Sequence, residues 1–87
     1  MKYNQCQKDV IYYIIGYSEN PVGKLTPCAD AFRHIFREKY TNLELEENVG
    51  TLVSSGVLKP YRFHSYLNLT ETFKTSHDYK LFKDKKF

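Results

Sequence analysis

The stretch TNLELEENVGTLVSSGVLKPYRFHSYLNLT, residues 41–70, contains the signals that decide the fold. It opens with Thr41 and Glu44, which have the spacing of a capping box, in which two side chains satisfy the free backbone N–H groups at a helix start. Apolar residues then recur at helical spacing, which predicts a helix with one apolar face. The residues of that face are Leu45, Val49, Leu52 and Val53.

A glycine and two β-rich segments follow this helix. Gly56 stands where a left-handed C-cap ends a helix. Val57 to Phe63 and Tyr66 to Leu69 are rich in β-branched, aromatic and leucine residues, which favour strands. His64 and Ser65 stand between them. The stretch therefore predicts a helix, a glycine stop and a short β-hairpin.

Two more amphipathic helices are predicted before this stretch. The first begins after Asn4 as its cap and runs to about Ser18, with a wide apolar face that suggests a central helix. The second begins at Thr26, with a proline at its first helical position, and runs to about Tyr40. Its apolar face is formed by Cys28, Ala31, Phe32, Ile35 and Phe36.

A last helix is predicted after the hairpin. Thr70 can serve as its cap, and Phe73, His77 and Leu81 would lie on one of its faces. The charged residues 83–87 then predict a frayed tail. The 87 residues correspond to a single domain, residues 1–87, with no repeat and no linker.

Taken together, these elements resemble a winged helix-turn-helix domain over about residues 4 to 82. The resemblance implies an α+β fold with a three-helix core, a two- or three-stranded β-wing and a C-terminal helix. A third wing strand would lie at Val22 to Leu25, and the last helix would contribute to a homodimer. The positions that match the family pattern are Leu52, Val53, Gly56, Val57-Leu58 and Tyr66-Leu67-Asn68-Leu69-Thr70.

The resemblance also implies binding of double-stranded DNA, with the third helix in the major groove and the hairpin along the backbone. Asn48 would pair with adenine, and nearby hydroxyls would reach phosphates. Basic residues before the third helix and on the wing would neutralise phosphates. The predicted DNA-binding residues are Lys24, Arg33, Arg37, Lys39, Asn48, Thr51, Ser54, Ser55, Lys59, Arg62 and His64.

The charge distribution opposes this function. The net charge is +3, but residues 41–57 contain three Glu and no Lys or Arg. A helix that binds in a DNA groove usually needs Lys or Arg residues nearby, because neutralisation of the phosphates dominates affinity. The alternative is a module for protein–protein interaction or dimerisation, in which aromatics at Tyr61, Phe63 and Tyr66 serve as interface anchors. Stacking of these aromatics on single-stranded nucleic acid is a third possibility.

The sequence predicts no enzyme, no metal site and no cofactor. No CxxC or HxxxH pair is present and no phosphate-binding glycine loop occurs. Cys28 lies on an apolar helix face, which favours a buried thiol over a nucleophile. The metal-ligating residue types are His34, His64, His77, Cys6 and Cys28.

Composition predicts a cytoplasmic, reduced protein without a membrane segment. Two cysteines are too few for a disulfide scaffold. The longest apolar run, Val10 to Ile15, is much shorter than the ~20 residues of a membrane helix. A domain of this size is marginally stable alone, which makes a dimer attractive.

Overall fold

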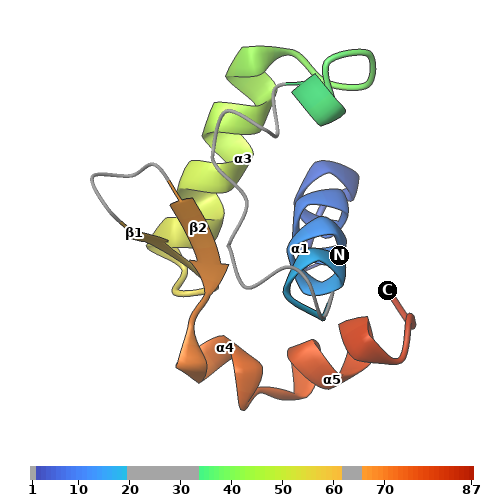
Figure 1. Ribbon diagram of the computed structural model, residues 1–87, viewed down its shortest axis with the longest axis vertical. Coiled ribbons are helices and arrows are strands. Elements are labelled where there is room, and N and C mark those ends of the chain that lie inside the picture. The colour runs from blue at the N-terminus through green and yellow to red at the C-terminus, as the bar shows by residue number, and fades with distance from the viewer. Residues whose placement is uncertain (1, 20–33, 62–65) are drawn as a thin grey trace.

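The computed structural model describes residues 2–19, 34–61 and 66–87 of the chain (Figure 1). Within them it contains four helices and one two-stranded antiparallel sheet, which is an α+β arrangement. Predictions for Val22 to Leu25, for the start of the second helix and for the turn at His64 lie outside the described residues. The elements are α1 (Gln5–Glu19), α3 (Asn42–Ser54), β1 (Leu58–Tyr61), β2 (Tyr66–Leu69), α4 (Glu71–Lys74) and α5 (His77–Lys83).

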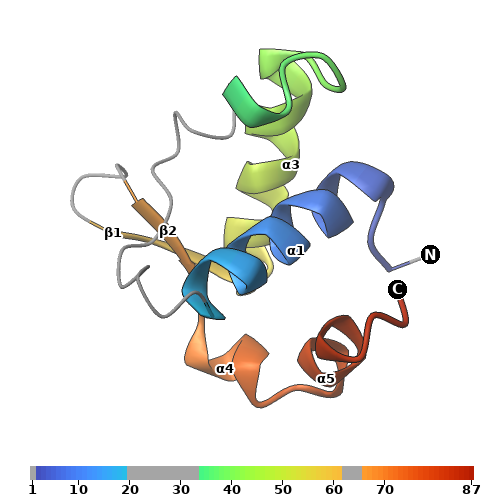
Figure 2. The same ribbon diagram turned by 45° about the vertical axis from the view of Figure 1, so that its right-hand side comes forward.

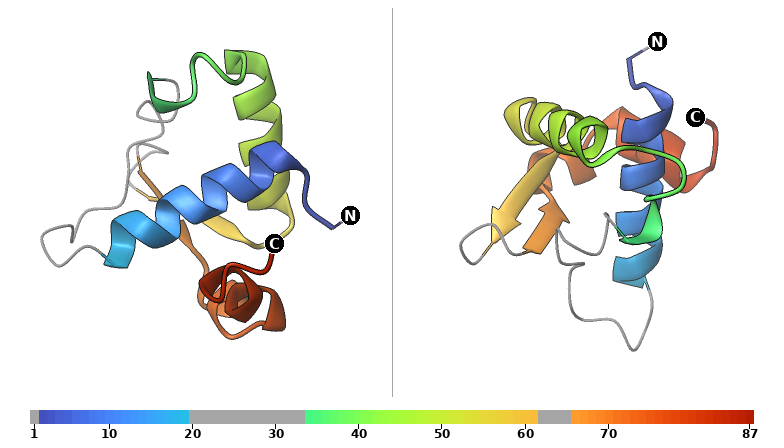
Figure 3. Two further views of the ribbon diagram at one scale, coloured as in Figure 1. Left: turned by 90° about the vertical axis from the view of Figure 1, so that its right-hand side faces the viewer. Right: turned by 90° about the horizontal axis from the view of Figure 1, so that it is seen from above.

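Helix α1 is the central helix that its apolar sequence predicts. It lies between α3 and the C-terminal helices (Figure 2) and crosses α3 in the side view (Figure 3, left). Asn4 caps it: the Asn4 Oδ1 accepts a hydrogen bond from the Gln7 N–H at 2.8 Å, and the Gln7 Oε1 accepts one from the Asn4 N–H at 3.0 Å. Val10, Ile11 and Ile14 are completely buried.

The predicted signals at both ends of α3 are confirmed. The Thr41 Oγ1 accepts a hydrogen bond from the Glu44 N–H, and the Glu44 Oε1 accepts one from the Thr41 N–H, each at 3.1 Å. Gly56 has a φ of +83°, a left-handed conformation that residues with a Cβ rarely adopt. The chain therefore turns sharply from α3 into β1.

The hairpin packs one end of its sheet into the core. Leu58 lies opposite Leu69, and both residues are 2% exposed. Strand β2 has the predicted bounds, whereas β1 begins at Leu58 rather than at the predicted Val57, and Arg62 and Phe63 lie outside the described residues. The core that joins the hairpin to the helices comprises Tyr3, Cys6, Val10, Ile11, Ile14, Ile15, Leu45, Leu52, Val57, Leu58, Leu69, Phe73 and Phe82.

The prediction that the second helix runs to about Tyr40 is wrong at its C-terminal end. Residues 34–35 are helical, but 36–40 form bends and turns, in which the N–H groups of Lys39 and Tyr40 both donate to the Phe36 carbonyl at 2.9 and 2.8 Å. The turn brings Lys39 and Tyr40 to Asp9 of α1. These tertiary contacts outweigh the helical preference of the segment.

The single C-terminal helix predicted after Thr70 is instead two short helices. Thr70 caps α4 as predicted, since its Oγ1 accepts a hydrogen bond from the Phe73 N–H at 3.0 Å. Ser76 then caps α5 through a 3.3 Å bond from the Tyr79 N–H. The break rotates the apolar face, so that Phe73 and Phe82 are buried while His77 is exposed.

The tail at 83–87, which we expected to fray, folds back onto the core. The ring of Phe87 lies 4.5 Å from that of Phe82 and 5.5 Å from that of Tyr3. The Tyr12 hydroxyl donates a hydrogen bond to the Phe87 backbone oxygen at 3.0 Å. In the part of the chain described, no helix is long and apolar enough to cross a membrane.

Candidate nucleic-acid interface

The outward side of α3 is the candidate interface. The helix runs along the edge of the molecule and leads directly into the hairpin (Figure 1). Its buried side faces α1, and the opposite side is open to solvent. The exposed residues of α3 and its C-cap are Asn42, Leu43, Glu44, Glu46, Glu47, Gly50, Thr51, Ser54 and Ser55.

Asn48 is not on that open side. Its side chain is half-buried, and its Nδ2 donates a 2.7 Å hydrogen bond to the Glu44 carbonyl. Its Oδ1 accepts a 2.7 Å bond from the Asn4 Nδ2 at the start of α1. Bidentate pairing with adenine would require both bonds to break. The side chain serves the α1–α3 junction in this arrangement.

The predicted phosphate-binding hydroxyls are exposed, but two of them already donate within the chain. The Thr51 Oγ1 donates to the Glu47 carbonyl at 3.0 Å, and the Ser55 Oγ donates to the Leu52 carbonyl at 3.2 Å. Both hydroxyls would have to rotate to donate to a phosphate. Ser54 is exposed and has no hydrogen bond among the described residues.

The predicted basic residues differ in their surroundings. Arg37 and Lys59 are exposed, before and after α3 along the chain. Lys39 is an ion-pair partner of Asp9, with its Nζ 2.7 Å from the Asp9 Oδ2. The remaining predicted residues, Lys24, Arg33, Arg62 and His64, lie outside the described residues.

The electrostatics of the junction keep the Cys6 thiol protonated. Burial raises the pKa of Cys6, and the negative charges of Asp9 and Glu44 raise it further, against the opposing effect of a hydrogen bond with Asn48. Cys6 is a buried free thiol with no features of a nucleophile. Across the described parts of the chain, no three His, Cys, Asp or Glu residues lie close enough to hold a metal ion.

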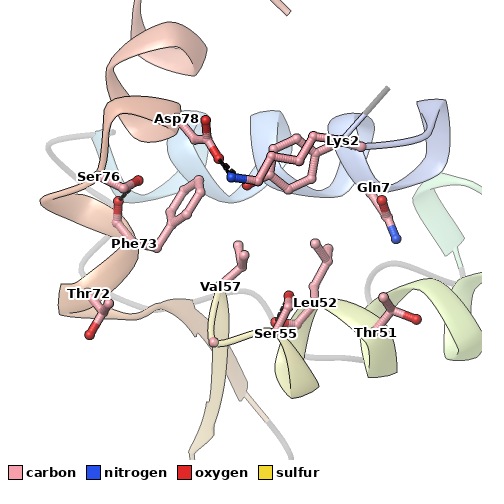
Figure 4. Close-up of a pocket in the computed structure, with 12 residues that line it drawn as sticks. Lys2, Gln7, Thr51, Leu52, Ser55, Val57, Thr72, Phe73, Ser76 and Asp78 are labelled. Atoms are coloured by element: carbon pink, nitrogen blue, oxygen red, sulfur yellow. Dashed lines mark hydrogen bonds and ion pairs between the residues drawn. The ribbon is translucent and has the colours of Figure 1, made fainter.

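A pocket of about 390 Å³ lies between α3, the start of α1 and α4 (Figure 4), and it adjoins the open side of α3, because Thr51 and Ser55 line it. At its rim the Lys2 Nζ lies 2.6 Å from the Asp78 Oδ2, and the Tyr3 hydroxyl donates to the same oxygen at 2.9 Å. The lining residues are Lys2, Tyr3, Gln7, Thr51, Leu52, Ser55, Gly56, Val57, Thr72, Phe73, Ser76 and Asp78.

Sequence reasoning did not find this pocket. Its residues come from both ends of the chain and from α3, and none of them belongs to a local motif. The hydrogen bond from Lys2 lowers the pKa of Asp78 against the effect of burial, and the hydrogen bond from Tyr3 adds to the lowering. Burial and the Asp78 carboxylate raise the pKa of Tyr3.

The chain matches no protein-family model, no curated protein and no solved structure with which it was compared. The function is therefore argued from the residues of the chain itself.

Proposed function

We propose that this protein is a winged helix-turn-helix domain that binds double-stranded DNA and acts as a small transcriptional regulator. The observation that carries the proposal is the succession of α3 and the hairpin. An amphipathic helix with an open outer side passes through the left-handed Gly56 into an antiparallel pair of strands. In winged-helix proteins a helix and hairpin in this order contact the groove and the backbone.

The charged residues around α3 determine the expected affinity for DNA and its dependence on salt. Arg37 precedes α3 in the sequence and Lys59 follows it. Both side chains are exposed and carry the positive charge that neutralises phosphates. Glu46 and Glu47 are exposed on the helix itself and repel them. We therefore expect weak binding with a steep dependence on salt and with little sequence preference from Asn48.

The test is fluorescence anisotropy with random and genomic duplex DNA at about 50 and 200 mM salt, a range over which phosphate-driven binding weakens steeply. Lys59→Ala should weaken binding broadly across sequences. Lys80→Ala, an exposed lysine on α5, is the matched control and should have a smaller effect. Absence of binding by the wild-type protein at the lower salt would reject the proposal.

A charge reversal tests whether α3 itself faces DNA. Glu47→Lys should raise affinity by about five- to tenfold near 100 mM salt, because it replaces a repelled carboxylate with a phosphate-binding ammonium. Glu71→Lys makes the same change in net charge at an exposed position of α4. Equal gains from the two variants would mean that only net charge matters and that α3 is not the docking helix.

The second candidate function is a module that binds protein, and one observation favours it. Leu43 is 63% exposed at the start of α3, a helix that also carries the exposed carboxylates of Glu46 and Glu47, and Ile35 is 47% exposed earlier in the chain. Exposed apolar side chains framed by charge are typical of protein interfaces. If this surface forms a homodimer, sedimentation at ~50 μM should give a dimeric mass that Leu43→Ser lowers; a dimer at low micromolar affinity would be populated there. A monomer in both cases would exclude self-association.

A further inference from the structure

We propose that the pocket between α1, α3 and α4 binds a small, mostly apolar, neutral molecule that carries a carbonyl group. We call it the Gln7 pocket, with the lining residues given above. This inference goes beyond DNA binding and does not depend on it, although Thr51 and Ser55 border both the pocket and the open side of α3. Its volume of about 390 Å³ lies within the range of pockets that hold small organic ligands.

The interior of the Gln7 pocket is apolar. Leu52, Val57 and Phe73 extend into it from α3, the start of the hairpin and α4 (Figure 4). These side chains belong to the core and are 1%, 6% and 4% exposed, so their positions are held by packing. A preformed apolar wall of this kind favours a ligand with an apolar body.

One polar atom that faces the Gln7 pocket has no hydrogen-bond partner among the described residues. Gln7 is only 9% exposed, and its Oε1 is held by the Asn4 N–H at 3.0 Å. That bond identifies the other amide atom as the Nε2, which has two hydrogens to donate. The Nε2 has no hydrogen-bond acceptor among the described residues and is open to solvent in the pocket, because none of their buried side-chain nitrogens or oxygens is left unpaired. Figure 4 shows it directed from α1 toward the α3 side of the pocket.

The other polar groups determine what the ligand must offer. The hydroxyl hydrogens of Thr51 and Ser55 are used within α3, so these residues present no donor to the pocket. The side-chain donors that remain are the Gln7 amide, the Lys2 ammonium, which has hydrogens beyond the one that faces Asp78, and the Thr72 hydroxyl, which Figure 4 shows directed away from the interior. The ligand must therefore bring an acceptor.

The charge at the rim favours a neutral acceptor over an anion. The Asp78 carboxylate lies at the same rim and already pairs with Lys2 at 2.6 Å. An anionic ligand would compete with Asp78 for Lys2 and would be repelled by it. A ketone, an ester or an amide meets the Gln7 donor without this penalty.

The experiment uses acetophenone as the probe and ethylbenzene, which has the same skeleton without the carbonyl, as its comparison. Each is titrated to about 1 mM into the ¹⁵N-labelled protein, a concentration suited to millimolar affinity. Acetophenone should shift the amide resonances of Gln7, Leu52, Val57 and Phe73. Ethylbenzene should bind up to about tenfold more weakly, as loss of one hydrogen bond inside the pocket predicts.

Two comparisons between proteins test whether the probe binds in the Gln7 pocket: Gln7→Glu with the wild-type protein, and Thr51→Leu with Ser54→Leu. Gln7→Glu retains an oxygen for the Asn4 N–H but removes the amide donor. The variant should therefore bind acetophenone and ethylbenzene with about equal affinity. Thr51→Leu should block the mouth of the pocket, whereas Ser54→Leu places the same side chain on an exposed position that does not line it. This second pair remains informative if Gln7→Glu fails to fold.

The outcomes either support or overturn the proposal. Localised shifts, a preference for the carbonyl and a loss of binding in Thr51→Leu alone support it. No shifts at the lining residues, equal binding of the two probes by the wild-type protein, or equal effects of Thr51→Leu and Ser54→Leu each overturn it. DNA binding is measured separately, so failure of one proposal does not decide the other.

Discussion

The Tyr40 hydroxyl donates a 2.6 Å hydrogen bond to the Asp9 Oδ2, the same oxygen that pairs with Lys39 at 2.7 Å. Asp9 lies in the second turn of α1, and Tyr40 immediately precedes the Thr41 cap of α3. The bond therefore fixes the start of α3 against the central helix. The orientation of the candidate DNA-binding helix depends on this contact as well as on its apolar face.

Removal of the Tyr40 hydroxyl should destabilise the protein. Tyr40→Phe removes a hydrogen bond to a charged acceptor, and we expect the free energy of unfolding to fall by about 1.5 kcal/mol. Tyr79→Phe is the matched control, because the Tyr79 hydroxyl has no hydrogen bond among the described residues. Urea denaturation of both variants measures the difference. Equal losses would show that the Tyr40–Asp9 bond contributes nothing specific.

Acid should destabilise the fold through two carboxylates. Burial raises the pKa of Asp9, but hydrogen bonds from Lys39, Tyr40 and Gln5 outweigh it and hold the pKa below its usual value. The pKa of Asp78 is lowered as well, chiefly by Lys2. A lowered folded-state pKa contributes stability above about pH 4 that is lost as the pH falls through the folded pKa. Denaturation at pH 6 and pH 3 should show this loss, and Asp9→Asn should reduce it.

Strong alkali should destabilise the fold through two tyrosines. Burial first, and then the hydrogen bonds to Asp78 and Asp9, raise the pKa of Tyr3 and of Tyr40. A raised folded-state pKa contributes stability that is complete below about pH 10 and is lost as the pH rises above it. The double variant Tyr3→Phe and Tyr40→Phe should lose less stability between pH 9 and pH 11 than the wild-type protein. Parallel curves would contradict the assignment.

Replacement by alanine should have opposite effects on stability at the two glycines on either side of the end of α3. Gly50 is an exposed position inside the helix with no atom within 4 Å of an added Cβ, so Gly50→Ala should stabilise by about 0.8 kcal/mol. Gly56 has equal space but a φ of +83°, so Gly56→Ala should destabilise by about 1.5 kcal/mol. Thermal unfolding of the pair separates backbone conformation from packing. The same sign for both would refute the left-handed turn at Gly56.

The aromatic contacts of Phe87 should contribute to stability. Phe87→Ala removes the ring packed on Phe82 and Tyr3, and we expect a loss of about 2 kcal/mol, less than for a fully buried phenylalanine. Lys86→Ala, at the exposed neighbouring position, should be nearly neutral. Urea denaturation compares the two. A neutral Phe87→Ala would support the frayed tail that the sequence predicts.

Local features of the sequence were sufficient for the starts of α1, α3 and α4 and for the stop of α3, but not for the start of α5. The cap at Asn4, the capping box of Thr41 with Glu44, the glycine at position 56 and the cap at Thr70 all act within one turn of the chain. The apolar spacing of α3 likewise predicts which side is buried. Each of these depends on neighbours within a few residues, which the sequence displays directly.

The rest was decided by contacts between segments that are distant in the chain. The Asn4–Asn48 bond turns a predicted base reader into a junction residue, and the Asp9 contacts end the second helix early. The Tyr3–Asp78 bond joins residues 75 positions apart and builds the rim of the Gln7 pocket. By itself the sequence determined where α1, α3 and α4 begin and which way α3 faces, because caps and periodicity are local. Only the tertiary structure decided the pocket, the role of Asn48 and the docking of Phe87, because those depend on which surfaces meet when the core is buried.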